Sequence, residues 1–175
     1  MWHLIDWISR VSAAIFVCLG AAAMAQAGTA TANLTVQITI TASCTINAAT
    51  LDFGSNAGTT LVAANIDAST TVSVTCTNGS PYSIGMDNGA NVSGSQRRMK
   101  SGANFLNYNL YVDSARTNAW TTAASSSTCT TTNSCFLGTG NGAAQSVSIY
   151  GRVPSSGTAP PTGTYTDTVT MTITY

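Results

Sequence analysis

The stretch that decides the fold is "GTYTDTVTMTITY", residues 163–175. From Tyr165 onward every even position is Thr, whereas the odd positions hold Tyr, Asp, Val, Met, Ile and Tyr. This period of two is typical of a β-strand with one buried face. An uncovered apolar strand edge is an aggregation hazard, so we expect a strand from elsewhere to cover this one. The side chains expected along the acceptor edge are Tyr165, Val169, Met171, Ile173 and Tyr175.

A second alternating segment lies near the other end of the chain. From Ala30 to Ile46 apolar side chains occupy the even positions and mostly Thr, Asn, Gln and Ser the odd ones. At about 3.3 Å per residue this segment would extend roughly 56 Å, whereas a compact domain of this size has a diameter of roughly 38 Å. We therefore predict two strands end to end: an N-terminal arm, residues 28–39, and a first domain strand at 40–47 that opens a domain of residues 40–175.

The arm is an extra strand with one apolar face, and the C-terminal strand lacks a neighbour, so the arm could pair with that edge. The arm could fold back onto its own domain, but its hinge near Thr39 has neither Gly nor Pro, so insertion into the next copy is favoured. Such a head-to-tail contact does not close and generates a fibre. Each buried donor side chain would contribute about 1.5–3 kcal/mol, and a domain without a donor is expected to be poorly stable. The donor side chains are Leu34, Val36, Ile38 and Ile40.

Residues 1–27 are predicted to be a secretory signal peptide. Arg10 supplies the positive end, residues 11–20 form the apolar core, and "AMAQA" at 23–27 is a cleavage site of small residues. Cleavage after Ala25 and cleavage after Ala27 fit equally well. A membrane anchor is the alternative, but the apolar run is short for a hydrocarbon layer of about 30 Å.

The remaining chain has few charges and little catalytic chemistry. Five Asp face five Lys and Arg, with no His and no Glu, so we predict no nucleic-acid partner. The cluster "QRRMK" at 96–100 is interpreted as a solvated strand end rather than a phosphate site. General acids, bases and activated nucleophiles usually draw on His, Glu, Lys or a low-pKa Cys. With only Lys100 and the Asp residues present, we predict no catalytic residue, no cofactor and no enzyme.

Four cysteines follow the leader: Cys44, Cys76, Cys129 and Cys135. A secreted protein is expected to use them in disulfides. The first two lie at strand-like positions and the last two bracket the polar loop "CTTTNSC", so we predict the pairs 44–76 and 129–135. A four-thiolate zinc site would need short paired C-x-x-C spacing, and we predict no metal.

Short apolar runs between turn signals continue along the chain. The segment 69–86 predicts two strands around an Asn-Gly-Ser-Pro turn, 86–91 is a hairpin turn signal, and 104–113 and 145–153 are further strands. About seven strands at this spacing favour an all-β, immunoglobulin-like sandwich. Trp120, Tyr108 and Tyr111 are interpreted as core or cross-strand residues rather than as sugar-stacking surfaces.

The chain resembles the spore coat protein U domain family, which includes subunits of archaic chaperone–usher pili. The resemblance rests on "ASCTI", "VSVTC", "RRMKSGANFLNYNLYVDSARTNAW" (97–120) and "IYGRVP…PPTGTYTDTVTMTITY". It implies an incomplete immunoglobulin-like fold that lacks its last strand. It also implies a periplasmic chaperone that lends a strand and an outer-membrane usher that exchanges it for another subunit's arm. The family's donor role falls on Leu34, Val36 and Ile38, and its disulfide on Cys44 and Cys76; a 129–135 ring departs from the pattern.

We therefore expect a structural pilus subunit, serving adhesion or biofilm formation, secreted through the periplasm to the cell surface. Its expected partners are other copies of itself or sibling pilins, the chaperone and the usher. The alternative is a secreted adhesin or carbohydrate-binding module that acts as a discrete protein, with exposed Tyr and Trp side chains stacking on sugars.

Overall fold

The structure is a computed structural model that describes residues 26–120 and 135–175. It divides into two units, residues 1–38 and 39–175. Most of the predicted leader, residues 1–27, lies outside the described residues, so the leader stays a prediction. In the first unit, the described residues 26–38 are exposed and have no assigned helix or strand.

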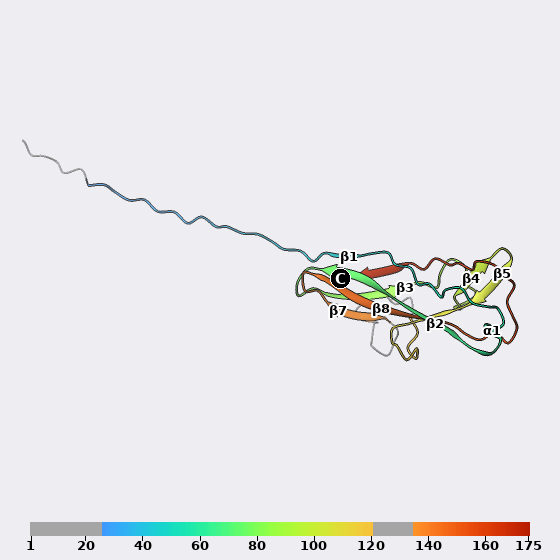
Figure 1. The fold of residues 1–175 in the computed structure, drawn as a ribbon. Coiled ribbons are helices and arrows are strands. Elements are labelled where there is room, and N and C mark those ends of the chain that lie inside the picture. Colours follow the sequence, from blue (N-terminus) through green and yellow to red (C-terminus); the bar gives the residue numbers. More distant parts are fainter. Residues whose placement is uncertain (1–25, 121–134) are drawn as a thin grey trace, which may run out of the picture. The chain divides into compact units, whose positions relative to one another are not determined.

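The second unit is all-β apart from one four-residue helix, α1 (Thr60–Ala63). Its strands form two main sheets and a separate hairpin (Figure 1). The first sheet has the order β1-β2-β8-β6, with bounds Cys44–Ile46, Ile66–Cys76, Ala144–Val153 and Asn109–Tyr111. The second has the order β7-β3-β9, with bounds Phe136–Thr139, Pro81–Met86 and Met171–Thr174. The hairpin pairs β4 (Arg98–Ser101) with β5 (Asn104–Asn107). No helix in the described ranges is long and apolar enough to cross a membrane.

The core lies between the two main sheets. β2 and β8 alternate between buried and more exposed residues along their paired length, which is how a strand with one core face behaves. The first sheet contributes Val72, Val74, Leu110, Val147 and Ile149, and the second contributes Tyr82, Ile84 and Met86. Two sheets that share one apolar layer form a β-sandwich.

The sheet order is that of an immunoglobulin-like domain with one position unfilled. In the seven-strand arrangement, strands A, B, E and D form one sheet and C, F and G the other. The order β1-β2-β8-β6 corresponds to A, B, E and D, while β3 and β9 take the places of C and F. Within the described residues, β9 pairs only with β3, so no strand occupies the place of G. The predicted fold class is confirmed.

Several strands differ from their predicted limits. The strand expected at 104–113 is interrupted at Tyr108: β5 pairs with β4, whereas β6 pairs with β8 in another sheet. The turn at 86–91 forms, but it joins no hairpin, because β3 pairs with β7 and β9 instead. Only Cys44–Ile46 of the first strand expected at 40–47 is assigned as strand. For β6 and β3, strand partners from distant parts of the chain override the local pattern.

The final segment buries the side chains that the sequence predicted, but it does not form one continuous strand. From Tyr165 to Ile173 the odd positions are partly buried and the even positions exposed, as the alternation predicts, whereas Tyr175 is exposed. The assigned strand β9 covers only Met171–Thr174. Upstream of it, Thr166 forms an isolated bridge with Lys100 of the hairpin, so the extended segment changes partners before it joins the sheet.

The predicted disulfide between Cys44 and Cys76 is confirmed, with an S–S distance of 2.01 Å. The two residues lie directly opposite each other in the β1–β2 register, so the bond ties the edge strand β1 to its neighbour. Cys135 is buried, but Cys129 lies outside the described residues and the 129–135 pair stays a prediction.

The interpretation of residues 96–100 as a solvated strand end is wrong for Arg97. This side chain is 5% exposed, and its guanidinium donates hydrogen bonds to the carbonyl oxygens of Met86, Asp87 and Trp120. Burial lowers the pKa of Arg97 from its ordinary value. Trp120 and Tyr108 are buried, at 2% and 4% exposure, so their interpretation as core residues is confirmed.

Candidate functional site

A groove opens between the two sheets along the final extended segment. One wall is formed by residues 164–169 with Met171, and the other by residues 49–53. The cavity between them measures about 470 Å³. Its floor includes the core side chains of Met86, Leu110 and Ile149. The apolar layer of the sandwich is therefore open to the outside along one side.

The opposite wall is held against β8 by a glycine. A Cβ atom at Gly151 would collide with Leu51 and Phe53, so the absence of a side chain there allows both apolar residues to lie close to the strand. Both pack against the core cluster while remaining partly exposed. The strands β1 and β9, which are edge strands of the two sheets, contact each other.

The main chain along the groove has an open edge. On the side towards β3, Thr170 and Thr168 accept hydrogen bonds from the N–H groups of Asp87 and Ala90, both at 3.0 Å. Successive residues of an extended chain point their N–H and C=O groups to opposite edges, so those of Asp167 and Val169 point to the other side. No hydrogen bond found among the described residues uses the main chain of Asp167 or Val169.

A partly buried polar cluster holds the open segment in place. The Asp167 Oδ2 atom accepts a hydrogen bond from the Tyr108 hydroxyl at 2.6 Å, and Oδ1 accepts from the backbone N and the Nδ2 of Asn91, at 3.1 and 3.0 Å. Gly89 has φ +80°, and a Cβ there would strike the Asp167 carboxylate. Gly89 therefore permits both the turn and the close approach of Asp167.

The environment of Tyr108 keeps its hydroxyl protonated. Burial raises the pKa of this phenol far above its ordinary value, and its hydrogen bond to the Asp167 carboxylate raises the pKa further. A neutral phenol is the form that donates a proton to a carboxylate, so the contact persists at any ordinary pH.

The sequence-predicted acceptor residues fall into two groups. Tyr165, Val169 and Met171 line the groove. Ile173 packs against the core but does not line the cavity, and Tyr175 is 57% exposed. Their function as an acceptor edge stays a prediction.

The predicted donor side chains are unburied apolar residues. Leu34, Val36, Ile38 and Ile40 are 87%, 85%, 82% and 72% exposed, respectively. Isolated exposed apolar side chains are ordinary on protein surfaces, but four at alternate positions give one apolar face to an extended segment. Their donor role also stays a prediction.

The sequence patterns did not predict the wall at Leu51 and Phe53 or the partly buried polar cluster around Asp167. The alternation in "TLDFGS" at 50–55 could have indicated the wall, since Leu51 and Phe53 are two residues apart. No sequence signal indicates that Tyr108 and Asp167, 59 residues apart, are hydrogen-bonded.

A second cavity of about 620 Å³ continues past Tyr165. It shares Leu51, Phe53, Met99 and Tyr165 with the first cavity. Pro160 and Pro161, in the loop that leads into the final segment, also line this cavity. The concave surface therefore extends beyond the part lined by Val169 and Met171.

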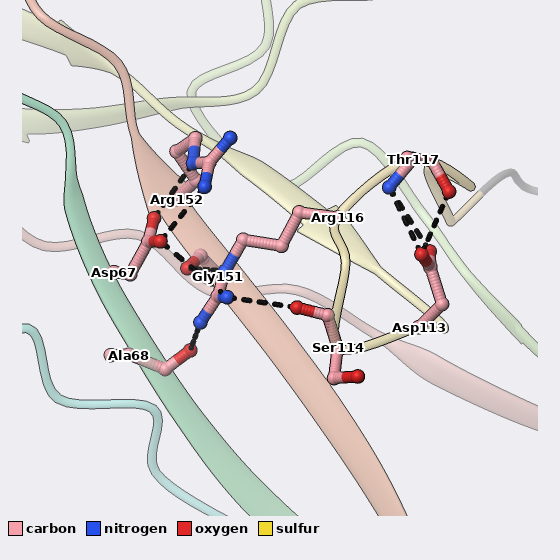
Figure 2. A network of polar contacts seen from close by, with 8 residues as sticks. All are labelled: Asp67, Ala68, Asp113, Ser114, Arg116, Thr117, Gly151 and Arg152. Atoms are coloured by element: carbon pink, nitrogen blue, oxygen red, sulfur yellow. Dashed lines mark hydrogen bonds and ion pairs between the residues drawn. The ribbon is translucent and has the colours of Figure 1, made fainter.

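An ion-pair network around Asp67 lies away from the groove (Figure 2). Arg152 donates two hydrogen bonds to the Asp67 carboxylate, at 2.7 and 2.8 Å, and Arg116 lies 3.4 Å from the same carboxylate. The bond from Arg152 lowers the pKa of Asp67, with the charge of Arg116 adding to the effect. In the neighbouring loop, Asp113 accepts hydrogen bonds from the backbone N–H groups of Thr117 and Asn118. No cluster of three or more His, Cys, Asp or Glu that could hold a metal ion occurs in the described ranges.

Two comparisons of the sequence with known proteins indicate the same family. The profile of the Spore Coat Protein U domain matches residues 30–172. Protein U of Myxococcus xanthus is 34% identical over 166 residues, which is 86% of this chain and 88% of that protein.

A solved structure supports the fold. The chain superposes with a TM-score of 0.55 and 24% identity on a crystal structure of the CsuC–CsuE chaperone–tip adhesion subunit pre-assembly complex from archaic chaperone–usher Csu pili of Acinetobacter baumannii. The match covers 78% of this chain and 40% of the solved one. The chain therefore belongs to the Spore Coat Protein U domain family.

Proposed function

We propose that this Spore Coat Protein U domain protein is a structural subunit of a cell-surface pilus, whose copies join when the arm of one occupies the groove of the next. The observation that carries the proposal is the open edge at Asp167 and Val169, which runs beside a 470 Å³ cavity with core side chains on its floor. An added strand would satisfy the open main chain and cover the core at once.

The arm has the chemistry of the missing strand. Its exposed side chains at 34, 36, 38 and 40 are all aliphatic and occupy alternate positions, so they lie on one face of an extended arm. That face would enter the groove, while Thr35, Gln37 and Thr39 would face water. The expected contribution of each buried side chain is about 1.5–3 kcal/mol. Because the donor and the acceptor lie on opposite ends of one chain, each joining step leaves one arm and one groove free for the next.

Family membership supports the assembly route. We propose that a periplasmic chaperone occupies the groove in transit and that an outer-membrane usher exchanges it for an arm of another copy or of a sibling pilin. The protein would thus travel through the periplasm to the surface, without an enzymatic activity, and serve adhesion or biofilm formation. The solved relative is described as a complex of a chaperone with a tip adhesion subunit, which fits this route.

A deletion tests the proposal in cells that also express the neighbouring assembly genes. Surface material from cells with the full chain should contain long fibres in electron micrographs. A chain that lacks residues 28–39 should be exported and bound by the chaperone but should form no long fibres. Long fibres from the deleted chain would refute the role of the arm.

Self-complementation is the competing outcome for the same arm. If the arm fills the groove of its own chain, the full-length protein is a stable monomer whose unfolding does not depend on protein concentration. Strand exchange between copies instead gives assembly that accelerates with concentration, as light scattering would record.

A further inference from the structure

The acidic side chains of the domain are all engaged within the chain. Asp52 accepts a hydrogen bond from the N–H of Gly54, and Asp67 is paired with two arginines. Asp87, Asp113 and Asp167 each accept hydrogen bonds from backbone N–H groups of nearby or distant loops. Of these five carboxylates, only Asp67 forms salt bridges within the described residues, and its partners are Arg116 and Arg152.

Only some of the basic side chains have a carboxylate partner. Arg97 is buried among carbonyl oxygens, and Arg116 and Arg152 are paired with Asp67. Arg98 and Lys100 have no carboxylate within salt-bridge distance in the part of the chain that the structure describes. The stretch 121–134, which is not described, contains no charged residue at all.

Both unmatched bases lie on one face of the β4–β5 hairpin. In its register Lys100 is opposite Phe105 and Arg98 is opposite Asn107. The other face carries Met99 and Leu106, which pack against the core. This face of the hairpin therefore carries two cations and one aromatic ring, of which Lys100 and Phe105 are exposed and Arg98 is partly exposed. The hairpin lies at the end of the sandwich away from β1 (Figure 1).

The aromatic ring lies with both cations. Phe105 is 44% exposed; the Arg98 guanidinium lies 4.2 Å and the Lys100 ammonium 5.8 Å from the centre of its ring. We call Arg98, Lys100 and Phe105 the hairpin patch.

Hydrogen bonds hold the hairpin patch in place, but the Arg98 guanidinium still has N–H donors that are free within the described part of the chain. The backbone of Lys100 exchanges two hydrogen bonds with Thr166. The Arg98 guanidinium donates from Nε to Asn91 and from Nη2 to Val92. A guanidinium has five N–H donors, so donors on both terminal nitrogens remain for a carboxylate that binds them together.

We propose that the hairpin patch binds an acidic polysaccharide. Side chains two apart on a strand face have Cα atoms about 6.6 Å apart, so Arg98 and Lys100 present two cations in line for two acidic groups of a linear polymer. The exposed part of Phe105, opposite Lys100 on the neighbouring strand, offers an apolar contact for the C–H face of a sugar ring.

Other anionic partners fit the patch less well. A single exposed aromatic ring gives little apolar area for a bilayer, where binding strength scales with buried apolar surface. Duplex nucleic acid is bound through many phosphate contacts, and this domain has equal numbers of acids and bases.

One patch of two cations binds weakly, whereas a fibre repeats it on every copy. Linked sites raise the apparent affinity by about 10² to 10⁴ without any new contact. The avidity rests on the proposed pilus function, but the contact between one patch and the polymer does not.

The test uses alginate, a polymer of uronic acids, with neutral dextran as the negative control. Full-length protein is compared with the double variant Arg98→Gln/Lys100→Gln. A second double variant, Arg116→Gln/Arg152→Gln, removes the same charge from another surface. Binding is measured at low salt with fibres and with dilute single copies, and circular dichroism checks that each variant folds.

The hairpin variant should lose about tenfold or more in affinity for alginate, whereas the control variant should stay within about twofold of the parent. The variant Phe105→Leu should show an intermediate loss. Equal losses in both double variants would show that only net charge matters and would overturn the proposal. Equal binding of the parent to anionic lipid vesicles would overturn the choice of polysaccharide.

Failure of the fibre and failure of the patch are distinguishable. If no fibres form, yet single copies bind alginate through Arg98 and Lys100, the patch stands and the pilus function falls. If fibres form but do not bind alginate, only the proposal for the hairpin patch is refuted.

Discussion

Tyr108 donates a 2.6 Å hydrogen bond to the Asp167 carboxylate, which joins the break between β5 and β6 to the segment along the open edge. Through this contact a buried residue fixes the position of the groove wall. Asn91 and Gly89 complete the attachment from the turn after β3.

High pH should loosen this attachment. Burial raises the pKa of Tyr108 in the folded protein, whereas an unfolded tyrosine ionises near pH 10. Its contribution to stability is therefore complete below about pH 10 and is lost as the pH rises beyond that value. The free energy of unfolding of the parent should fall above that pH in urea titrations, and Tyr108→Phe should show a smaller fall. An identical alkaline loss in both proteins would contradict the assignment.

A charge on the inner face of the arm should block joining. Ile38→Asp would place a carboxylate in an apolar groove, at a cost of several kcal/mol unless it finds a partner. Gln37→Asp adds the same charge one residue away, on the predicted outer face. We expect assembly followed by light scattering to slow strongly for Ile38→Asp and little for Gln37→Asp. Similar kinetics for the two variants would show that Ile38 does not lie on the inner face of the arm.

Removal of the disulfide should weaken the edge strand β1. Cys44 and Cys76 close a loop with a sequence separation of 32, for which loop-closure entropy gives roughly 3–4 kcal/mol. The double variant Cys44→Ser/Cys76→Ser should lose about that much unfolding free energy in urea. A loss well below 1 kcal/mol would indicate that β1 contributes little to the fold.

A side chain at Gly151 should displace the groove wall. In Gly151→Ala the new methyl group would strike Leu51 and Phe53, and such overpacking costs about 1–3 kcal/mol. Thermal unfolding should record this loss, while Gly28→Ala, where a Cβ meets no atom, should serve as a neutral control. An unchanged melting temperature would mean that the wall moves freely.

Patterns with one buried face were predictable from sequence. The alternation at 165–173 predicted which side chains turn inward, and the strand-like positions of Cys44 and Cys76 predicted their bond. The segments at 69–86 and 145–153 were predicted as strands, and β2, β3 and β8 occupy them. In each case the period of two reflects a single local constraint, which is burial of one face.

Features that depend on partners from distant parts of the chain were not predictable. Nothing local marks Tyr108 as the point where the chain leaves the hairpin for another sheet, or Arg97 as buried. Arg97 is stabilised there by three carbonyl oxygens, from Met86, Asp87 and Trp120, and only the folded chain brings these together. The groove itself is a product of the sheet order.

Amide hydrogen exchange at Val169 tests the central claim most directly. The N–H of this residue points to the open edge, whereas the N–H of the next residue, Thr170, is bonded to Asp87. In the domain of residues 40–175, Val169 should exchange rapidly alone and slowly once a peptide of residues 28–40 is added, and it should gain more protection than Thr170, which is already hydrogen-bonded. Slow exchange without the peptide, or no change on adding it, would contradict strand donation.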